Sequence, residues 1–230
     1  MTVARPGWLI WLVLLAASAS CDDDASVEPD AADEDAFEAV EDVPEEAQAE
    51  EADDGSRPDQ PIGPTDYPPG PYGIAVGDRL ENLRFLGTDG ATLSLSSFYA
   101  DRSVKLLWVF ASSGWCSVCA IEAAALPRIW NEYNPQGLQI LGAVFEDVAY
   151  NPATVTYAAS YARRYRWPFP GASDQPFVLG RYFDKAATPL NMLVDLTDMT
   201  IVRMETGWDE ASMAARVRYH LAAIADRNDP

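Results

Sequence analysis

The chain has 230 residues, and 48% of them are hydrophobic, which is enough apolar material for one sizeable domain rather than two. The formal net charge of −20 is unevenly distributed, because residues 22–66 hold 19 acidic residues and one basic residue whereas residues 67–230 hold 17 acidic and 14 basic residues. Neither part concentrates positive charge, so the composition excludes nucleic acid as a partner.

The N-terminus has the composition of an export signal. Residues 1–20 contain a single basic residue, the apolar run WLIWLVLLAA and the small residues SAS before Cys21. The run has half of the roughly 20 residues that a membrane-spanning helix needs, so we predict a cleaved signal peptide. The stretch resembles a bacterial lipobox, with Ser18 where Leu is usual, and we expect Cys21 to become the lipidated first residue. The alternative is cleavage by the general signal peptidase, which leaves Cys21 in a tail.

Residues 21–71 form the next segment, which is rich in Asp, Glu, Ala and Pro and has few large apolar residues. Such a segment cannot bury enough apolar surface to offset the entropy lost on ordering. We therefore predict a disordered acidic tether, and a partner-binding acidic tail is the alternative. A flexible chain of about 45 residues has an r.m.s. reach of roughly 35–40 Å.

The first half of the predicted domain, residues 72–225, begins with strand signals. Residues 82–95 hold two short apolar stretches around a Thr-Asp-Gly turn, which predicts a β-hairpin. Residues 104–111 form a continuous apolar run, which is typical of a strand buried on both faces. Residues 117–133 have a helical composition, and we expect Pro127 to kink or shorten this helix.

The second half alternates strands and helices. Residues 138–146 predict another buried strand, and residues 151–165 predict a helix with Asn151 as N-cap and Pro152 at its first position. A short helical piece, a strand, its hairpin partner and an amphipathic helix follow at residues 176–183, 189–196, 199–207 and 209–225. This order predicts an α/β fold in which helices flank a mixed central sheet, followed by a tail at residues 226–230.

Two cysteines lie where the first buried strand gives way to a helix. Cys116 is placed at or near the helix N-terminus, and Cys119 lies one turn inside. The free N–H groups and the dipole of a first helical turn stabilise a thiolate, so we expect the pKa of the Cys116 thiol to lie below its usual value near 8.5. The spacing of three residues allows the shielded Cys119 to reach Cys116 and resolve a mixed disulfide.

Three kinds of site compete for this pair. A zinc site needs about four ligands, and the mature domain offers no further cysteine and only one histidine, His220. A structural disulfide across a two-residue loop removes little unfolded-state entropy. A redox pair accounts for the spacing, the position at a strand-to-helix junction and the exported compartment. We therefore expect a redox pair, with neither metal nor cofactor.

The motif GWCSVC after a buried strand and the pair Thr188-Pro189 before a later one resemble the thioredoxin-like thiol–disulfide oxidoreductases. The sequence is most similar to exported lipoproteins of the TlpA/ResA/redoxin type over residues 72–223. The resemblance implies a thioredoxin-like fold with an N-terminal hairpin and an inserted helix near residues 139–170.

The resemblance also implies roles for particular residues. Pro189 is expected to be cis and to face the cysteines, and the Thr188 backbone to pair with an extended substrate segment. Trp115 is expected on the rim of the substrate surface. Glu122 occupies the place of an acid that tunes the thiols in some members, although an acid favoured by the helix dipole is an equal alternative.

The sequence also departs from the family. The loop before the WC dipeptide is two residues longer, and the buried Asp of thioredoxins falls on Trp108. The usual proton acceptor for the resolving cysteine is therefore absent, which leaves Glu122 or Glu146 for this role. Ser117 and Val118, between the thiols, supply neither a cation nor a proline, so a strongly oxidising enzyme is not expected.

The resulting hypothesis is a lipid-anchored thiol–disulfide oxidoreductase on the extracytoplasmic side of a bacterial membrane, inner or outer. We expect it to act as a monomeric reductase through Cys116 and Cys119, with protein thiols or disulfides and an upstream electron donor as partners. A peroxiredoxin-like peroxide reductase is an alternative, although no Pro-x-x-x-Thr-x-x-Cys pattern appears. A tethered binding or redox-sensing module without turnover is the other. The direction of electron flow and the substrate stay open.

Overall fold

The computed structural model describes residues 67–228. The expected signal peptide, the expected lipidation site Cys21 and residues 21–66 of the expected tether lie outside this range. Among the described residues, no helix combines the length and the apolar character required to cross a bilayer.

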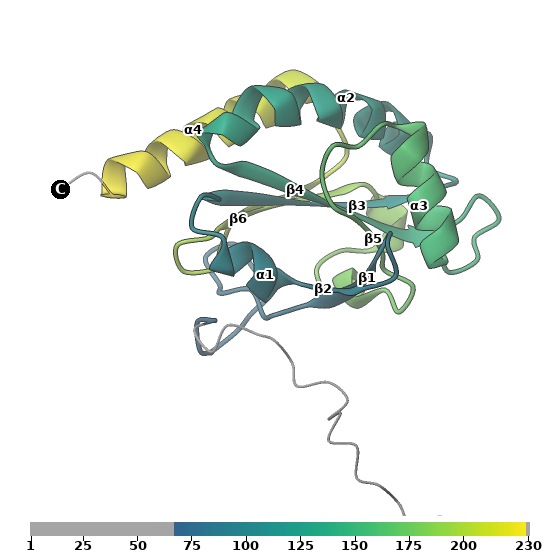
Figure 1. The fold of residues 1–230 in the computed structure, drawn as a ribbon, viewed down its shortest axis with the longest axis horizontal. Coiled ribbons are helices and arrows are strands. Elements are labelled where there is room, and N and C mark those ends of the chain that lie inside the picture. Colours follow the sequence, from purple (N-terminus) through teal and green to yellow (C-terminus); the bar gives the residue numbers. More distant parts are fainter. Residues whose placement is uncertain (1–66, 229–230) are drawn as a thin grey trace, which may run out of the picture. The chain divides into compact units, whose positions relative to one another are not determined.

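A seven-stranded mixed sheet forms the centre of the fold, in the order β2-β1-β5-β4-β3-β6-β7. Its central strands β3 and β4 are parallel, and β6 and β7 extend the sheet in antiparallel fashion. The strands are β1 (Arg84–Gly87), β2 (Thr92–Ser94), β3 (Leu106–Ser113), β4 (Leu138–Glu146), β5 (Gly171–Ser173), β6 (Leu190–Asp195) and β7 (Thr200–Thr206). The sheet confirms the predicted fold class, a mixed sheet flanked by helices (Figure 1).

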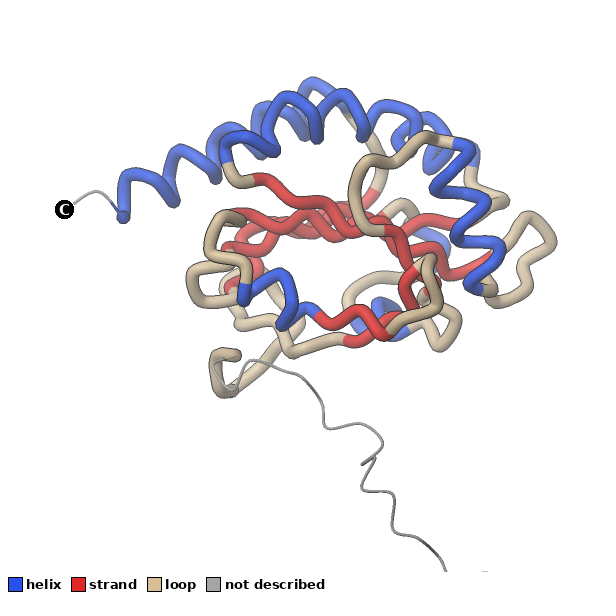
Figure 2. Tube along the Cα trace, viewed as in Figure 1, coloured by secondary structure: helices blue, strands red, loops and turns tan. Residues whose placement is uncertain are grey.

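Helices cover both faces of the sheet (Figures 1 and 2). Helices α2 (Ser117–Tyr133), α3 (Val155–Arg164) and α4 (Glu210–Asn228) pack against one core, and α1 (Leu95–Ala100) and the 3-10 helix η2 (Val178–Arg181) pack against the other. Two further 3-10 helices are η1 (Asn134–Gln136) and η3 (Lys185–Ala187). Helix α4 continues to Asn228, beyond the expected end of the domain at residue 225.

Strand β3 shows why the sheet needs two helical layers. All eight of its residues are buried. Trp108 and Phe110 belong to the core beneath α2, α3 and α4, whereas Leu107 and Val109 belong to the opposite core. The continuous apolar run is therefore buried on both faces, as predicted.

Helix α3 begins later than the sequence predicts. Its N-cap is Thr154, whose hydroxyl accepts the N–H of Tyr157 at 3.1 Å, and not Asn151. The cause is the end of β4: Pro152 forms an isolated antiparallel bridge with Glu146, and the Ala153 N–H donates to the Phe145 carbonyl. These pairings keep residues 152–153 outside the helix until Thr154.

The sequence predicts that Pro127 kinks or shortens its helix, and the shortening is wrong, because α2 runs through Pro127 to Tyr133. Proline has no N–H, so the carbonyl of Ala123 one turn earlier lacks its helical donor. The indole N–H of Trp167 donates to that carbonyl at 3.1 Å. A tertiary hydrogen bond thus replaces the helical one.

Candidate functional site

The site begins where β3 leads into α2. The Gly114 N–H donates to the carbonyl of Glu146 at 2.8 Å, which continues the β3–β4 pairing to the last residue of β4. A Cβ at Gly114 would lie 1.9 Å from the Tyr157 hydroxyl and 2.7 Å from the Val148 nitrogen. Glycine is therefore required here, because the chain passes the β4–α3 loop too closely for any side chain.

Cys116 is the N-cap of α2, in agreement with its predicted place at or near the helix N-terminus. Its Sγ accepts the N–H of Cys119 at 3.0 Å and is joined to Cys119 Sγ in a disulfide. Cys116 retains 7% of its accessible surface, and Cys119 is completely buried. Ser117 and Val118 between them are exposed. An incoming sulfur can therefore approach the first cysteine, whereas the second lies inside the core.

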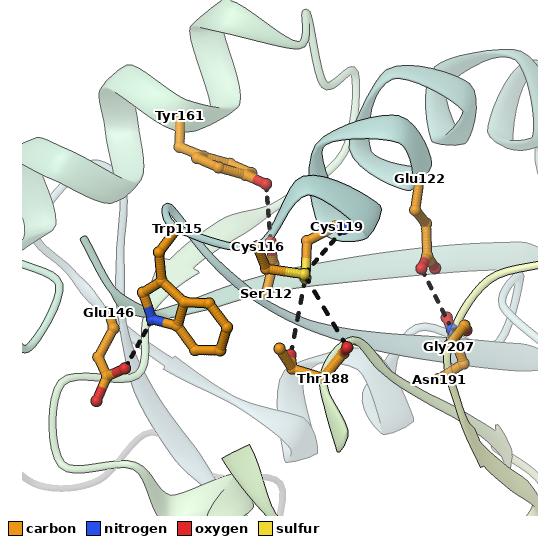
Figure 3. The surroundings of a disulfide bond; sticks show 10 residues. All are labelled: Ser112, Trp115, Cys116, Cys119, Glu122, Glu146, Tyr161, Thr188, Asn191 and Gly207. Atoms are coloured by element: carbon orange, nitrogen blue, oxygen red, sulfur yellow. Dashed lines mark hydrogen bonds between the residues drawn. A yellow bond between two sulfur atoms is a disulfide. The ribbon is translucent and has the colours of Figure 1, made fainter. Parts of the chain in front are cut away.

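Thr188, the residue before Pro189, faces the disulfide (Figure 3). The Thr188–Pro189 peptide bond is cis, as the resemblance implies. The Thr188 carbonyl oxygen lies 4.0 Å from Cys116 Sγ, and its hydroxyl lies 3.7 Å from Cys119 Sγ. The Thr188 N–H already donates to the Lys185 carbonyl at 3.3 Å, which leaves the carbonyl as the backbone group beside Cys116.

Trp115 is half-buried next to Cys116 and is held on three sides. Its indole N–H donates to Glu146 Oε2 at 2.9 Å. Its ring stacks on Tyr150, with centroids 5.1 Å apart, and meets the Phe145 ring edge-on. The Trp115 side chain is thus fixed between Cys116 and the β4–α3 loop.

Glu146 connects the two sides of the site. One carboxylate oxygen accepts the Trp115 indole N–H, and the other forms an ion pair with Lys185. Lys185 also lies over the Phe177 ring, 4.6 Å from its centroid, and belongs to η3, which leads directly into Thr188. Both oxygens are therefore engaged, and Glu146 is better suited to hold the site together than to accept a proton.

Glu122 has the opposite character. It lies on α2 three residues after Cys119, so the two residues share a helix face, and it is completely buried. Oε2 accepts the amide of Asn191 at 3.3 Å, and Oε1 has no partner among the described residues. Burial raises the pKa of Glu122 well above its ordinary value. Figure 3 shows this carboxyl pointing from α2 toward β6.

Trp108 occupies the strand position that thioredoxins give to a buried aspartate, according to the resemblance. Its indole N–H donates to Asn191 Oδ1 at 2.7 Å. The buried hydroxyl groups of Ser112 and Tyr161 share a hydrogen bond of 2.8 Å. Burial raises the pKa of Tyr161, so this phenol remains neutral.

Sequence reasoning did not identify Asn191, Lys185 and Tyr150 as parts of the site. A signal existed for Asn191, which is the one polar residue in the apolar stretch PLNMLV. Lys185 lies only four residues before Pro189, but lysines are common in surface loops. Tyr150 offered no distinguishing signal, because its contact with Trp115 depends on the path of the β4–α3 loop.

Comparison with known proteins identifies a family for this chain and solved structures with a similar fold. A model described as the AhpC/TSA family matches residues 76–216. The thioredoxin domain of a thiol-disulfide oxidoreductase from Bacteroides vulgatus superposes with a TM-score of 0.52 at 19% identity, covering 65% of this chain and 99% of that one. A peroxidoxin, BcpB of Mycobacterium tuberculosis, superposes with a TM-score of 0.53 at 16% identity, covering 66% and 99%.

A thiol:disulfide interchange protein from a Bacteroides species gives a TM-score of 0.52 at 17% identity, covering 65% of this chain and 91% of that one. At these identities the solved structures establish the thioredoxin-like fold and nothing further. No protein in the curated set matches the sequence significantly.

Proposed function

The chain belongs to the AhpC/TSA family, and on this premise we propose that it is a thiol–disulfide oxidoreductase that reduces disulfides of extracytoplasmic proteins. The observation that carries the proposal is the cysteine pair. Cys116 caps α2 and retains 7% of its accessible surface, Cys119 is completely buried and bonded to it, and Thr188 faces both sulfurs. A structural disulfide would need neither the residual accessibility of Cys116 nor a loop residue that faces both sulfurs.

The proposed cycle begins with the reduced pair. The Cys116 thiolate, stabilised by the N–H groups at the start of α2, attacks one sulfur of a substrate disulfide and releases the other as a thiolate. Cys119 then loses its proton and attacks Cys116 Sγ. The substrate leaves with both sulfurs reduced, and the Cys116–Cys119 disulfide remains, as in the structure. An upstream dithiol donor returns two electrons to the pair.

We propose that Glu122, rather than Glu146, accepts the proton that Cys119 loses. Glu122 shares a face of α2 with Cys119, its Oε1 has no partner among residues 67–228, and its raised pKa suits a group that accepts and returns a proton. Both oxygens of Glu146 are occupied by Trp115 and Lys185.

The substrate is proposed to bind as an extended segment between Trp115 and Thr188. The Thr188 carbonyl, beside Cys116 Sγ, would accept a backbone N–H of that segment. Trp115, fixed by Glu146 and Tyr150, would form the opposite wall. The expected lipid anchor at Cys21 and acidic tether would hold this monomeric domain at an extracytoplasmic membrane surface.

Peroxide reduction is the second candidate, because a peroxidoxin shares the fold. In that reaction Cys116 would become a sulfenic acid and then condense with Cys119, which gives the same disulfide. Peroxide-dependent oxidation of the reduced pair, compared with its oxidation by a protein disulfide, separates the two activities. Our proposal requires the protein disulfide to react faster.

Trapping of mixed disulfides tests the proposed function. Cys119→Ser should accumulate covalent complexes with substrate proteins, since the resolving thiol is absent, and dithiothreitol should release them. Cys116→Ser is the matched control and should trap none. If Cys119→Ser traps no more than Cys116→Ser, the pair does not exchange with proteins, and a binding or sensing module becomes the better interpretation.

A further inference from the structure

A chain of polar side chains crosses the core beneath α2. It runs from the Trp108 indole on β3 through the Asn191 amide on β6 to the Glu122 carboxyl on α2. All three side chains are completely buried among apolar residues. Buried polar groups are costly unless hydrogen-bonded, and Glu122 Oε1 has no partner among the described residues. This arrangement therefore needs an explanation beyond packing.

The hydrogen-bond partners fix the orientation of the Asn191 amide. An indole N–H can only donate, so Asn191 Oδ1 faces Trp108, at 2.7 Å. A backbone carbonyl can only accept, so Nδ2 faces the carbonyl of Gly207, at 2.9 Å. The remaining amide hydrogen is left for Glu122 Oε2, at 3.3 Å. A rotated amide would oppose donor to donor at Trp108 and acceptor to acceptor at Gly207.

The two oxygens of Glu122 therefore differ. Oε2 is bound by a donor of fixed direction, whereas Oε1 is buried without a partner in the described part of the chain. We propose that Asn191 is a positioning residue for the exchange reaction, holding Glu122 Oε2 so that Oε1 is the oxygen that accepts and returns the Cys119 proton. This inference rests on the proposed function.

Among the groups around Glu122, Asn191 is the one whose contact favours the charged carboxylate. Burial and the negative charge of Glu205 on β7 both favour the neutral carboxyl, and the Asn191 hydrogen bond favours the carboxylate. The charge of Glu205 is itself balanced by Arg203 on β7 and Arg216 on α4. Tyr161 on α3 also faces this region, and its own raised pKa keeps it neutral.

The proton balance of the resolving step follows from this arrangement. The Cys119 S–H bond breaks, its proton moves to Glu122 Oε1, and the sulfur electron pair forms the bond to Cys116 Sγ. The electrons of the broken mixed disulfide leave on the substrate sulfur. Without the Asn191 donor, Glu122 stays protonated to higher pH and cannot take the proton at the pH at which the native enzyme works.

The test is the Asn191→Leu variant of the full chain, which removes the donor and keeps the side-chain size similar. The ¹³C signal of the Glu122 carboxyl, assigned by its loss in Glu122→Gln, is followed by NMR across pH. Loss of one hydrogen bond to the charged form should move its midpoint upward by about one pH unit. The pH profile of mixed-disulfide resolution should move by the same amount.

Met192→Ala is the matched control, because Met192 is the next residue on β6 and points into the opposite core. Met192→Ala should lower stability without moving the Glu122 titration midpoint or the pH profile of mixed-disulfide resolution. Trp108→Phe removes only the indole N–H that binds Asn191 Oδ1, so it should raise the Glu122 midpoint by a smaller amount. This variant replaces Asn191→Leu in the test if Asn191→Leu does not fold.

Unchanged NMR midpoints in Asn191→Leu, or in Trp108→Phe if the first variant is unfolded, overturn the inference. If the midpoint moves but the resolution profile does not, Asn191 orients Glu122 without serving the reaction, which also overturns it. Failure of the proposed function is recognised separately, because the wild-type chain would then resolve no mixed disulfide at any pH.

Discussion

Glu146 acts at the scale of a single residue, because one carboxylate joins the Trp115 side of the site to the loop that precedes Pro189. It is 8% exposed, and its two oxygens bind the Trp115 indole and the Lys185 ammonium. Lys185 is further fixed over the Phe177 ring. The separation between Trp115 and Thr188 therefore depends on this ion pair.

We predict that Glu146→Gln raises KM for a protein disulfide several-fold and leaves kcat nearly unchanged. Glutamine can still accept the Trp115 N–H, but it cannot form an ion pair with Lys185. Lys185→Met should have the same effect, and the double variant should be no worse than either single variant, with a coupling energy of about 1 kcal/mol. Steady-state reduction of insulin provides the measurement. Additive effects would show that the pair does not act as a unit.

The residues of the site differ in how far the sequence could predict them. Cys116, Cys119 and Trp115 belong to one local motif, and Thr188-Pro189 forms a second, so the resemblance is sufficient to place them in one site. Asn191 could not be assigned to Glu122 in this way. Its position opposite Phe110 depends on the register between β3 and β6, which is set by turns and packing far from either residue.

At the scale of elements, α2 and Trp167 depend on each other. The Ala123 carbonyl, freed by Pro127, receives the Trp167 indole N–H, and the Trp167 ring packs edge-on against Phe110. A Cβ at Gly142 on β4 would lie 2.2 Å from the same ring. Trp167 therefore links α2 to the centre of the sheet.

We predict that Trp167→Phe lowers the free energy of unfolding more in the native chain than in a Pro127→Ala background. In the native chain the Ala123 carbonyl loses its donor, whereas the alanine introduced by Pro127→Ala would supply a helical N–H. The difference should be about 1 kcal/mol in the free energy of unfolding, which urea denaturation of the four proteins in the cycle would measure. Equal costs in both backgrounds would mean that the indole contributes packing only.

Sequence reasoning missed strand β5 and misplaced the start of α3, for different reasons. Strand β5 has only three residues, Gly171–Ser173, and is buried between β1 and β4, so no periodic pattern marks it. The start of α3 was misplaced because the Asn151-Pro152 pair resembles a helix N-terminus, but the bridge from Pro152 to Glu146 keeps it extended. The long apolar strands and amphipathic helices were predictable because their patterns reflect the core directly.

At the scale of the whole molecule, buried carboxyls link stability to pH. Asp174 is 1% exposed, and burial raises its pKa from 3.8 to about 6. The N–H groups of Leu179 and Val178 stabilise its charged form and partly oppose this increase. Burial also raises the pKa of Glu122. At these two carboxyls the folded protein therefore binds more protons than the unfolded chain above pH 4, so their contribution to stability falls as pH rises.

We predict that the free energy of unfolding decreases by about 2 kcal/mol through Asp174 alone between pH 4 and pH 7, since its pKa shift is about two units and part of the effect is already present at pH 4. Asp174→Asn should be less stable overall, because an amide accepts only one of the two N–H groups, but should lack this part of the pH slope. Urea denaturation across that range would measure both. An identical slope in the variant would show that Asp174 is charged in the folded protein at low pH.

The central claim is that Cys116 and Cys119 form a reducing couple that turns over. The most direct measurement is the redox equilibrium of the pair against dithiothreitol and glutathione. We predict one reversible two-electron transition near the potential of thioredoxin, about −270 mV, because the exposed Ser117 and Val118 add neither a cation nor a proline to stabilise the thiolate further. A pair that cannot be reduced reversibly, or a potential near about −120 mV as in strong disulfide-forming oxidants, would contradict the account.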